Sequence, residues 1–103
     1  MALTFSTVDD DDKQLVLKLG GQLDALSAPE LLPTIDMIVA EKRSVIVVDL
    51  SELELIDSSG VTALVALYKR SRAVGGKVRV VGACDQPLAI FKLLRMDKVF
   101  QIS

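Results

Sequence analysis

The stretch VIVVDLSELELIDSSGVTALVALY, residues 45–68, decides the fold expected for this chain. Residues 44–50 are nearly all β-branched or apolar, which is typical of a strand buried on both faces of a sheet. After the short connection SELEL, apolar side chains recur with helical spacing through residues 61–68. The stretch therefore predicts a buried strand, a polar junction at residues 57–60 and an amphipathic helix.

Further elements are expected on both sides of this stretch. Strands are predicted at 3–7, 14–19 and 77–81, with a candidate edge strand at 98–103, and helices at 27–42 and 86–95. The aspartates at 9–12 predict a hairpin turn, and Gly20-Gly21 is expected to end the second strand. This order predicts one α/β domain over residues 1–103, with a four- to five-stranded mixed sheet and three helices.

Helix-start signals support the two outer helices. Ser27 is an expected N-cap, with Glu30 at capping-box spacing. Pro33 falls inside the same helix, where it removes a hydrogen bond and is expected to kink the chain. Asp85 is expected to cap the last helix.

The composition excludes several kinds of chemistry. The 103 residues contain no histidine, so neither a Ser-His-Asp triad nor a histidine-containing zinc site can form. The single cysteine, Cys84, is expected to be a small core residue, and neither glycine pair matches a phosphate-binding motif. We therefore expect no enzymatic activity, no metal and no cofactor.

Charge and hydropathy indicate the expected surroundings. The net charge is −2, and the acidic run at 9–12 leaves the remainder nearly neutral, which argues against nucleic acid as a partner. No apolar stretch approaches the roughly 20 residues that span a bilayer, and the start lacks signal-peptide features. We therefore expect a cytoplasmic protein without membrane insertion. Five basic residues are expected to be solvated: Lys69, Arg70, Arg72, Lys77 and Arg79.

The junction Asp57-Ser58-Ser59-Gly60 suggests either an ordinary helix start or a site. As a helix start, Ser58 would be the N-cap. Ser59 would then lie at the first helical position with its hydroxyl facing solvent, and Gly60 would leave bare backbone that another protein could approach. Because helix N-termini favour anions, the fold would tolerate a phosphate on Ser59.

A competing interpretation places the phosphoacceptor elsewhere. Asp49, which follows the buried run of residues 45–48, would take that role in a response-regulator receiver. That fold needs an acidic pair at the end of its first strand and more β/α units than this chain can supply. The receiver interpretation is therefore the weaker one.

The combined pattern resembles the STAS domain of bacterial anti-sigma-factor antagonists. LGGQLDALSAPEL, residues 19–31, resembles the family's entry into its first helix, with an aspartate at Asp24. Residues 45–82 resemble its central signature of buried strand, Asp-Ser-Ser-Gly, helix, glycine pair and next strand. The resemblance implies a STAS fold over nearly the whole chain. A further C-terminal helix, common in the family, is expected to be absent or replaced.

The resemblance also implies a function. In such antagonists the second serine of the motif, here Ser59, is phosphorylated by a partner anti-sigma factor that is a serine kinase, and a serine phosphatase reverses the modification. The unphosphorylated antagonist binds the kinase and frees the sigma factor, which controls transcription by partner switching. Asp24 and Asp57 match acidic positions near that serine, so the implied partner-binding residues are Asp24, Asp57, Ser58, Ser59 and Gly60.

STAS domains in other settings supply the alternative. STAS domains also serve in lipid-transport ABC complexes, as accessory subunits, and in sensory assemblies, so the alternative implied by the resemblance is an interaction subunit that is not phosphorylated. The lipid-transport subunits tend to have threonine at the position of Ser59, so the serine favours the antagonist. A neighbouring gene for a serine-kinase anti-sigma factor, or for a transporter, would separate the two.

Overall fold

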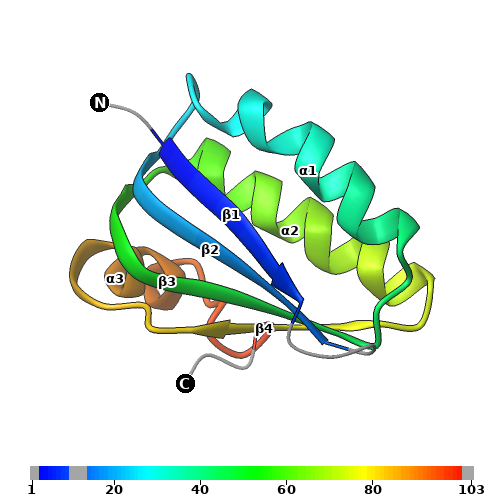
Figure 1. Ribbon diagram of the computed structural model, residues 1–103. Helices are drawn as coiled ribbons and strands as arrows, with labels where there is room; N and C mark the ends of the chain where they lie inside the picture. Colours follow the sequence, from blue (N-terminus) through cyan, green and yellow to red (C-terminus); the bar gives the residue numbers. More distant parts are fainter. Residues whose placement is uncertain (1–2, 10–13, 101–103) are drawn as a thin grey trace.

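The computed structural model describes residues 3–9 and 14–100 (Figure 1). Within them lie four strands and three helices: β1 (Leu3–Asp9), β2 (Gln14–Leu23), α1 (Ala28–Ala40), β3 (Val45–Ile56), α2 (Ser58–Ala73), β4 (Lys77–Val81) and α3 (Asp85–Leu93). They form one sheet in the order β1-β2-β3-β4. Strand β1 is antiparallel to β2, whereas β3 is parallel to both β2 and β4. The expected mixed sheet with three helices is confirmed.

The structure agrees with the strand pairing predicted near the N-terminus but not with the edge strand predicted at the C-terminus. The antiparallel pairing of β1 with β2 agrees with the expected hairpin, but its turn, residues 10–12, lies outside the described residues. The candidate edge strand is wrong for residues 98–100, which form a turn, while 101–103 lie outside the described part. The Phe100 carbonyl accepts a hydrogen bond from the Val80 N–H of β4 at 3.2 Å.

Strands β2 and β3 are longer than the sequence suggested. SELEL is not a connection, because β3 continues through it to Ile56, and Gly20-Gly21 does not end β2, which continues to Leu23. The register shifts twice in this part, where β3 carries the extra residues. Gly21, at φ 82°, adopts a conformation that glycine readily accepts. As a result both strands end side by side, with Leu23 opposite Ile56.

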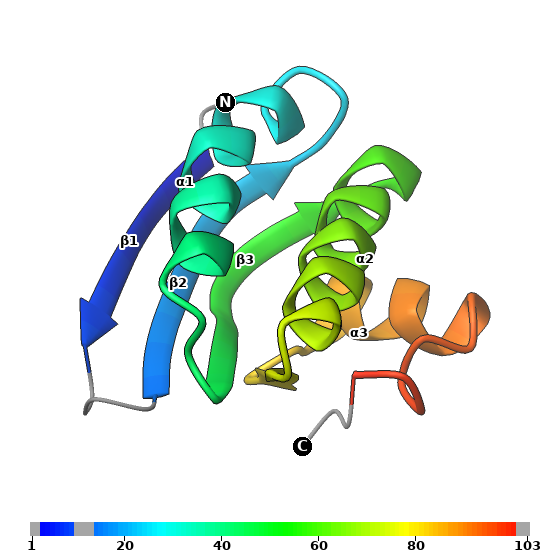
Figure 2. The ribbon, with the colours of Figure 1, turned by 90° about the vertical axis from the view of Figure 1, so that its right-hand side faces the viewer.

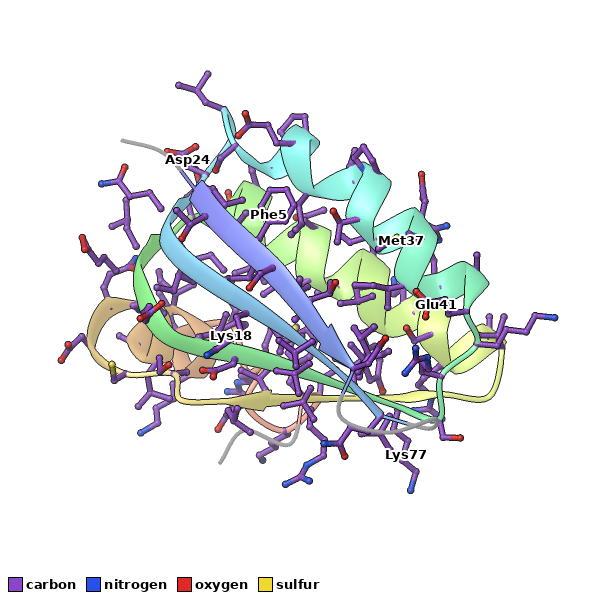
Figure 3. The ribbon with its side chains drawn as sticks, in the orientation of Figure 1. Phe5, Lys18, Asp24, Met37, Glu41 and Lys77 are labelled. Carbon is purple, nitrogen blue, oxygen red and sulfur yellow. The ribbon has the colours of Figure 1, made fainter. Side chains whose placement is uncertain are left out.

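Helices α1 and α2 lie next to each other over one face of the sheet (Figure 2). The alternation of β2 fits this arrangement, since Leu15, Leu17 and Leu19 are buried against the helices while Lys18 is exposed on the other face (Figure 3). The face of α1 that carries Ala28, Leu31, Ile35 and Ile38 is buried, whereas Leu32 is 46% exposed. Pro33 lies within α1, which nevertheless continues to Ala40.

Helix α3 packs against β3, and Phe100 links its aromatic ring to α2. The Phe100 ring lies edge-on between Tyr68 of α2, at 5.6 Å, and Phe91 of α3, at 5.7 Å between centroids. The N-cap residue of α3 is Cys84, not Asp85, and it makes no side-chain cap bond. Cys84 is exposed, so its expected place in the core is wrong, because it lies in the loop after β4.

Ser71 of α2 carries a buried hydroxyl without a hydrogen-bond partner among the described residues. Burying an unpaired polar group is unfavourable, and alanine is the better helix former. We expect Ser71→Ala to leave the free energy of unfolding unchanged or to raise it by up to about 1 kcal/mol, measured by urea denaturation.

Ser27 is the matched control, because it is also buried but its hydroxyl forms hydrogen bonds. It donates to the Gln22 carbonyl and accepts from the Asp24 N–H, both at 2.9 Å. Ser27→Ala should therefore lower the free energy of unfolding by about 1–2 kcal/mol. Equal losses in both variants would contradict the assignment.

Candidate functional site

The residues singled out by the sequence meet at one end of the sheet, where β2 and β3 end. The Asp57 N–H donates to the Leu23 carbonyl at 3.2 Å, which joins the last residue of β2 to the residue before α2. The β2–α1 loop, residues 24–27, therefore lies against the start of α2. The fold thus brings together two segments that are more than thirty residues apart in the chain.

Asp57 is the N-cap of α2. Its backbone is extended, at φ −113° and ψ −174°, and its Oδ1 accepts a hydrogen bond from the Gly60 N–H at 3.0 Å. The expectation that Ser58 is the cap is therefore wrong, because β3 keeps the chain extended as far as Asp57. A carboxylate suits this position, since it satisfies a free N–H and complements the helix dipole.

The second oxygen of Asp57 reaches the neighbouring loop. Oδ2 accepts a hydrogen bond from the Ala25 N–H at 3.2 Å. One carboxylate therefore holds both the first turn of α2 and the β2–α1 loop. The sequence predicted Asp57 as a member of the site, but its bridging role depends on the contact between β2 and β3.

The two serines occupy the first two positions of the helix. Ser58 is exposed, and its carbonyl accepts a hydrogen bond from the Thr62 hydroxyl at 2.8 Å. Ser59 is half-buried, and its hydroxyl has no hydrogen-bond partner among the described residues. A hydroxyl of this kind at a helix N-terminus is free to react or to contact a partner.

Gly60 is buried, contrary to the expectation that it offers bare backbone to a partner. A Cβ at this position would lie 2.5 Å from the Leu23 carbonyl oxygen and 2.7 Å from Cγ1 of Ile56. Glycine is therefore required here by internal packing, because α2 begins directly against the end of β2 and leaves no room for a side chain. Gly60 positions its neighbours and presents little surface of its own.

Asp24 organises the β2–α1 loop. Its Oδ1 accepts hydrogen bonds from the N–H of Leu26 at 3.0 Å and the N–H of Ser27 at 3.1 Å, and it lies 3.2 Å from the Ser27 hydroxyl, whose single hydrogen it shares with the Gln22 carbonyl. These bonds, above all the one from the Ser27 backbone, lower the pKa of Asp24 from its ordinary value of 3.8. Ser27 thus stands at the N-cap position of α1, but its hydroxyl serves the loop and does not cap the helix.

The lowered pKa of Asp24 makes loop stability depend on pH. The hydrogen bonds of the folded state favour the ionised carboxylate of Asp24. The contribution of this carboxylate to the free energy of unfolding is therefore fully present above the unfolded pKa of 3.8, and it is lost as pH falls through the lower pKa of the folded state. Asp24→Asn retains the acceptor oxygen but cannot ionise. We expect the free energy of unfolding to fall less in this variant than in the wild type between about pH 6 and about pH 3. Parallel losses in urea titrations would contradict the assignment.

Sequence reasoning missed two residues at this end of the molecule. Leu26 is 89% exposed in the β2–α1 loop, and nothing in its sequence context signals that exposure. Gln86 of α3 hydrogen-bonds both backbone groups of Ile56 at 2.9 Å. Only a contact between distant segments could reveal that pair.

Other candidate chemistry lies away from this end. Asp49 is within β3, where its Oδ1 accepts a hydrogen bond from the Ser51 N–H at 2.9 Å, a poor setting for a phosphoacceptor. The part of the chain that the structure describes holds no cluster of three or more metal-binding side chains. No helix in that part is long and apolar enough to cross a membrane.

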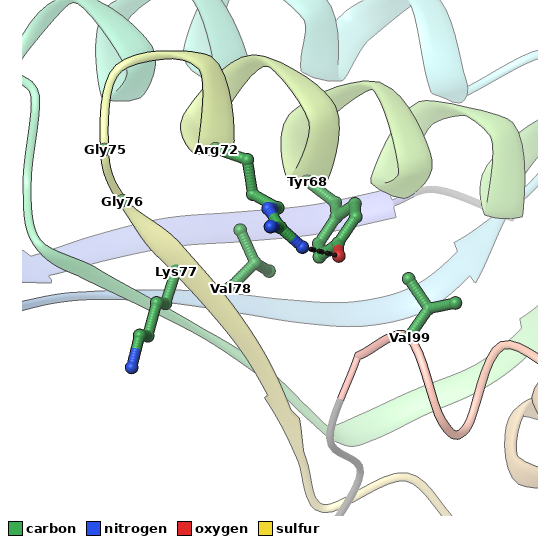
Figure 4. A pocket seen from close by; sticks show the side chains of 7 residues that line it. All are labelled: Tyr68, Arg72, Gly75, Gly76, Lys77, Val78 and Val99. Carbon is green, nitrogen blue, oxygen red and sulfur yellow. Dashed lines mark hydrogen bonds between the residues drawn. The ribbon is translucent and has the colours of Figure 1, made fainter.

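The opposite end of α2 borders a hollow of about 350 Å³ (Figure 4). The Arg72 guanidinium donates to the Tyr68 hydroxyl at 2.8 Å beside it, and Lys77 lies on its rim. The five basic residues expected to be solvated are all exposed, and Arg70 forms an ion pair with Asp36.

Comparison with known proteins connects this geometry with a family. A family model described as "Mlab, STAS domain" matches residues 6–102. The anti-sigma-F factor antagonist RsfB of Mycobacterium tuberculosis is 32% identical over 98 residues, which cover 93% of this chain and 78% of that protein. The anti-sigma-B factor antagonist of Listeria monocytogenes is 21% identical over 102 residues, covering 99% and 90%.

Solved structures agree in fold. An anti-sigma factor antagonist from Mycobacterium paratuberculosis superposes with a TM-score of 0.87 at 29% identity, covering 98% of this chain and 85% of that one. The phosphorylated form of the Bacillus protein SpoIIAA gives 0.77 at 18% identity, covering 97% and 91%, a likeness of fold alone. From the family model, the sequence relatives and the shared architecture, the chain belongs to the STAS-domain family.

Proposed function

We propose that this protein is an anti-sigma-factor antagonist that acts by binding, without catalysing a reaction. The names of its relatives support this, since the protein from M. tuberculosis at 32% identity and the structurally similar protein from M. paratuberculosis are both antagonists. The partner is an anti-sigma factor that is also a serine kinase, and a serine phosphatase restores the unmodified protein. The switch operates in the cytoplasm.

Ser59 is the proposed site of phosphorylation. The observation that carries this assignment is that Ser59 is half-buried at the second position of α2 and that no described residue hydrogen-bonds its hydroxyl. Asp57 already caps the helix through Gly60, so Ser59 is not needed to hold the turn together. Its hydroxyl can therefore be modified without breaking a hydrogen bond of the fold.

The surface around Ser59 is the proposed contact for the anti-sigma factor. It combines Asp24 and Asp57, which stiffen the loop and the helix start, with the exposed side chains of Ser58 and Leu26. Gly60 contributes by allowing the close packing that places its neighbours. An exposed leucine beside hydroxyls and carboxylates offers both apolar area and polar specificity.

Phosphorylation would act on binding more than on folding. A phosphate adds about −1.5 to −2 charges next to Asp57 at an interface. Because every 1.4 kcal/mol or so changes affinity tenfold, repulsion within a desolvated contact readily releases the partner. The α2 N-terminus favours an anion, which limits damage to the fold.

Phosphopeptide mass spectrometry on protein from its own cells tests this function. The peptide that contains Ser58 and Ser59 should carry phosphate on Ser59, with an occupancy that changes between growing and stressed cultures. Absence of phosphate under every condition would favour the alternative, an unphosphorylated STAS subunit of a lipid-transport ABC complex or sensory assembly. Co-purification with an anti-sigma factor or with transporter subunits separates these outcomes independently.

A further inference from the structure

We propose that Gln86 is a positioning residue that fixes the β3–α2 junction, and through it Ser59, from helix α3. Its Oε1 accepts a hydrogen bond from the Ile56 N–H, and its Nε2 donates to the Ile56 carbonyl, both at 2.9 Å. Ile56 directly precedes the N-cap Asp57. This inference rests on the proposed function of Ser59.

The Gln86 amide takes the place of a missing strand. Strand β4 pairs with β3 only from Val45 to Asp49, so its last pair lies seven residues before Ile56. A primary amide offers one donor and one acceptor in the same spacing as a peptide unit, which suits it to pair with strand backbone. Gln86 therefore continues the hydrogen bonding of this edge at the point where the chain enters the site.

The junction is consequently held from two sides. On the side of β2, the Asp57 N–H donates to the Leu23 carbonyl, and on the side of α3 both backbone groups of Ile56 bind Gln86. Ile56 is fully buried, and both hydrogen bonds that the Gln86 side-chain amide makes to it are partly buried. Loss of the α3 side would leave buried backbone groups unpaired and free the junction to move.

The entry into α3 supports a positioning role. Asp85 has φ 52°, a left-handed conformation that is uncommon for residues with a side chain, although aspartate adopts it more readily than most, and Cys84 makes no side-chain cap bond. The chain thus accepts backbone strain at the residue directly before Gln86. Strain of this kind persists where surrounding contacts require it, and the paired bonds to Ile56 are such contacts.

The test compares Gln86→Met, which retains length but cannot pair with the backbone, with Lys92→Met, an exposed control on the same helix. Amide hydrogen exchange and NMR shifts report the junction without a partner. In Gln86→Met we expect hydrogen exchange of the Ile56 amide to be about tenfold faster than in the wild type. We also expect the NMR signals of the Ser59 and Gly60 amides to shift, because the Gly60 N–H binds the Asp57 carboxylate that caps α2. Gln86→Glu retains an acceptor for the Ile56 N–H but sets an oxygen against the Ile56 carbonyl, so we expect exchange at Ile56 to be intermediate between the wild type and Gln86→Met.

A second control separates positioning from stability. Phe91→Leu lowers the stability of the same helix through its buried core face and leaves Gln86 intact. If it shifts the Ser59 and Gly60 amides as Gln86→Met does, or if Gln86→Met leaves them unchanged, the inference is overturned.

The functional arm uses the anti-sigma factor kinase that co-purifies with the wild-type protein. Under saturating kinase we expect phosphorylation of Gln86→Met to be about tenfold slower than that of Lys92→Met. Equal rates would overturn the role of Gln86. Failure of the wild type itself to be phosphorylated would instead refute the proposed function, and the amide measurements would still decide whether Gln86 positions the junction.

Discussion

Replacing Gly60 with alanine should lower the free energy of unfolding by about 3 kcal/mol, the upper part of the range for overpacking. The added Cβ would lie 2.5 Å from the Leu23 carbonyl oxygen, 2.7 Å from Cγ1 of Ile56 and 2.9 Å from Cγ of Leu23. The nearest of these atoms belongs to the backbone, so a rotamer change cannot relieve the contact. Only a shift of α2 away from β2 can do so.

That shift would break other interactions. The Asp57 N–H would leave the Leu23 carbonyl, and its Oδ2 would leave the Ala25 N–H. The melting temperature should therefore fall by roughly 10–20 °C, measured by thermal denaturation followed by circular dichroism. Ser59 should also be displaced, so phosphorylation and partner binding should weaken together.

Gly75 provides the matched control. It also lacks a side chain but has open space around its Cβ position, and its φ of 88° makes the backbone the only source of strain. Gly75→Ala should lose about 1–2 kcal/mol, clearly less than Gly60→Ala. A melting temperature of Gly60→Ala equal to that of the Gly75 variant would contradict the packing argument.

Replacing Ser59 with aspartate should weaken binding to the anti-sigma factor by about a hundredfold and leave the melting temperature within a few degrees of the wild type. The new carboxylate lies two residues after Asp57, at a surface that the partner would desolvate. The fold is affected little, because the Ser59 hydroxyl makes no hydrogen bond to a described residue and a helix N-terminus favours negative charge.

Two variants separate charge from size and position. Ser59→Asn has nearly the size of the aspartate variant without its charge, so it should weaken binding less than tenfold. Ser58→Asp places the same charge one residue earlier, on the exposed first position of α2. Titration calorimetry with the purified anti-sigma factor measures all three. A large fall in melting temperature for Ser59→Asp, or equal binding losses for the aspartate and asparagine variants, would contradict the switch mechanism.

Much of the fold was predictable because hydrophobic periodicity is a local property. The apolar run at 45–48 and the helical stripe at 61–68 predicted β3 and α2, and the pattern of KVRVV predicted β4. Element ends were less predictable. SELEL has too many charges to suggest a strand, yet it extends β3 because β2 pairs with it through Gly20 and Gly21.

The same division applies to the candidate site. Asp57, Ser58 and Ser59 are adjacent in the chain, and they lie together at the start of α2 as expected. The choice of Asp57 over Ser58 as the cap depended on how far β3 remains extended, which its pairing with β2 determines. Cys84 was expected in the core because no histidine is present to make it a nucleophile, but it lies exposed in the loop after β4.

The sequence by itself determined the order of the four strands and three helices and the position of the Asp-Ser-Ser-Gly junction at a helix start, since each depends on residues close together in the chain. Tertiary structure alone decided that Gly60 must accommodate the Leu23 carbonyl, that Asp57 joins α2 to the β2–α1 loop, and that Gln86 binds Ile56. These contacts join segments about thirty or more residues apart, and their geometry follows from how β2, β3 and α3 pack.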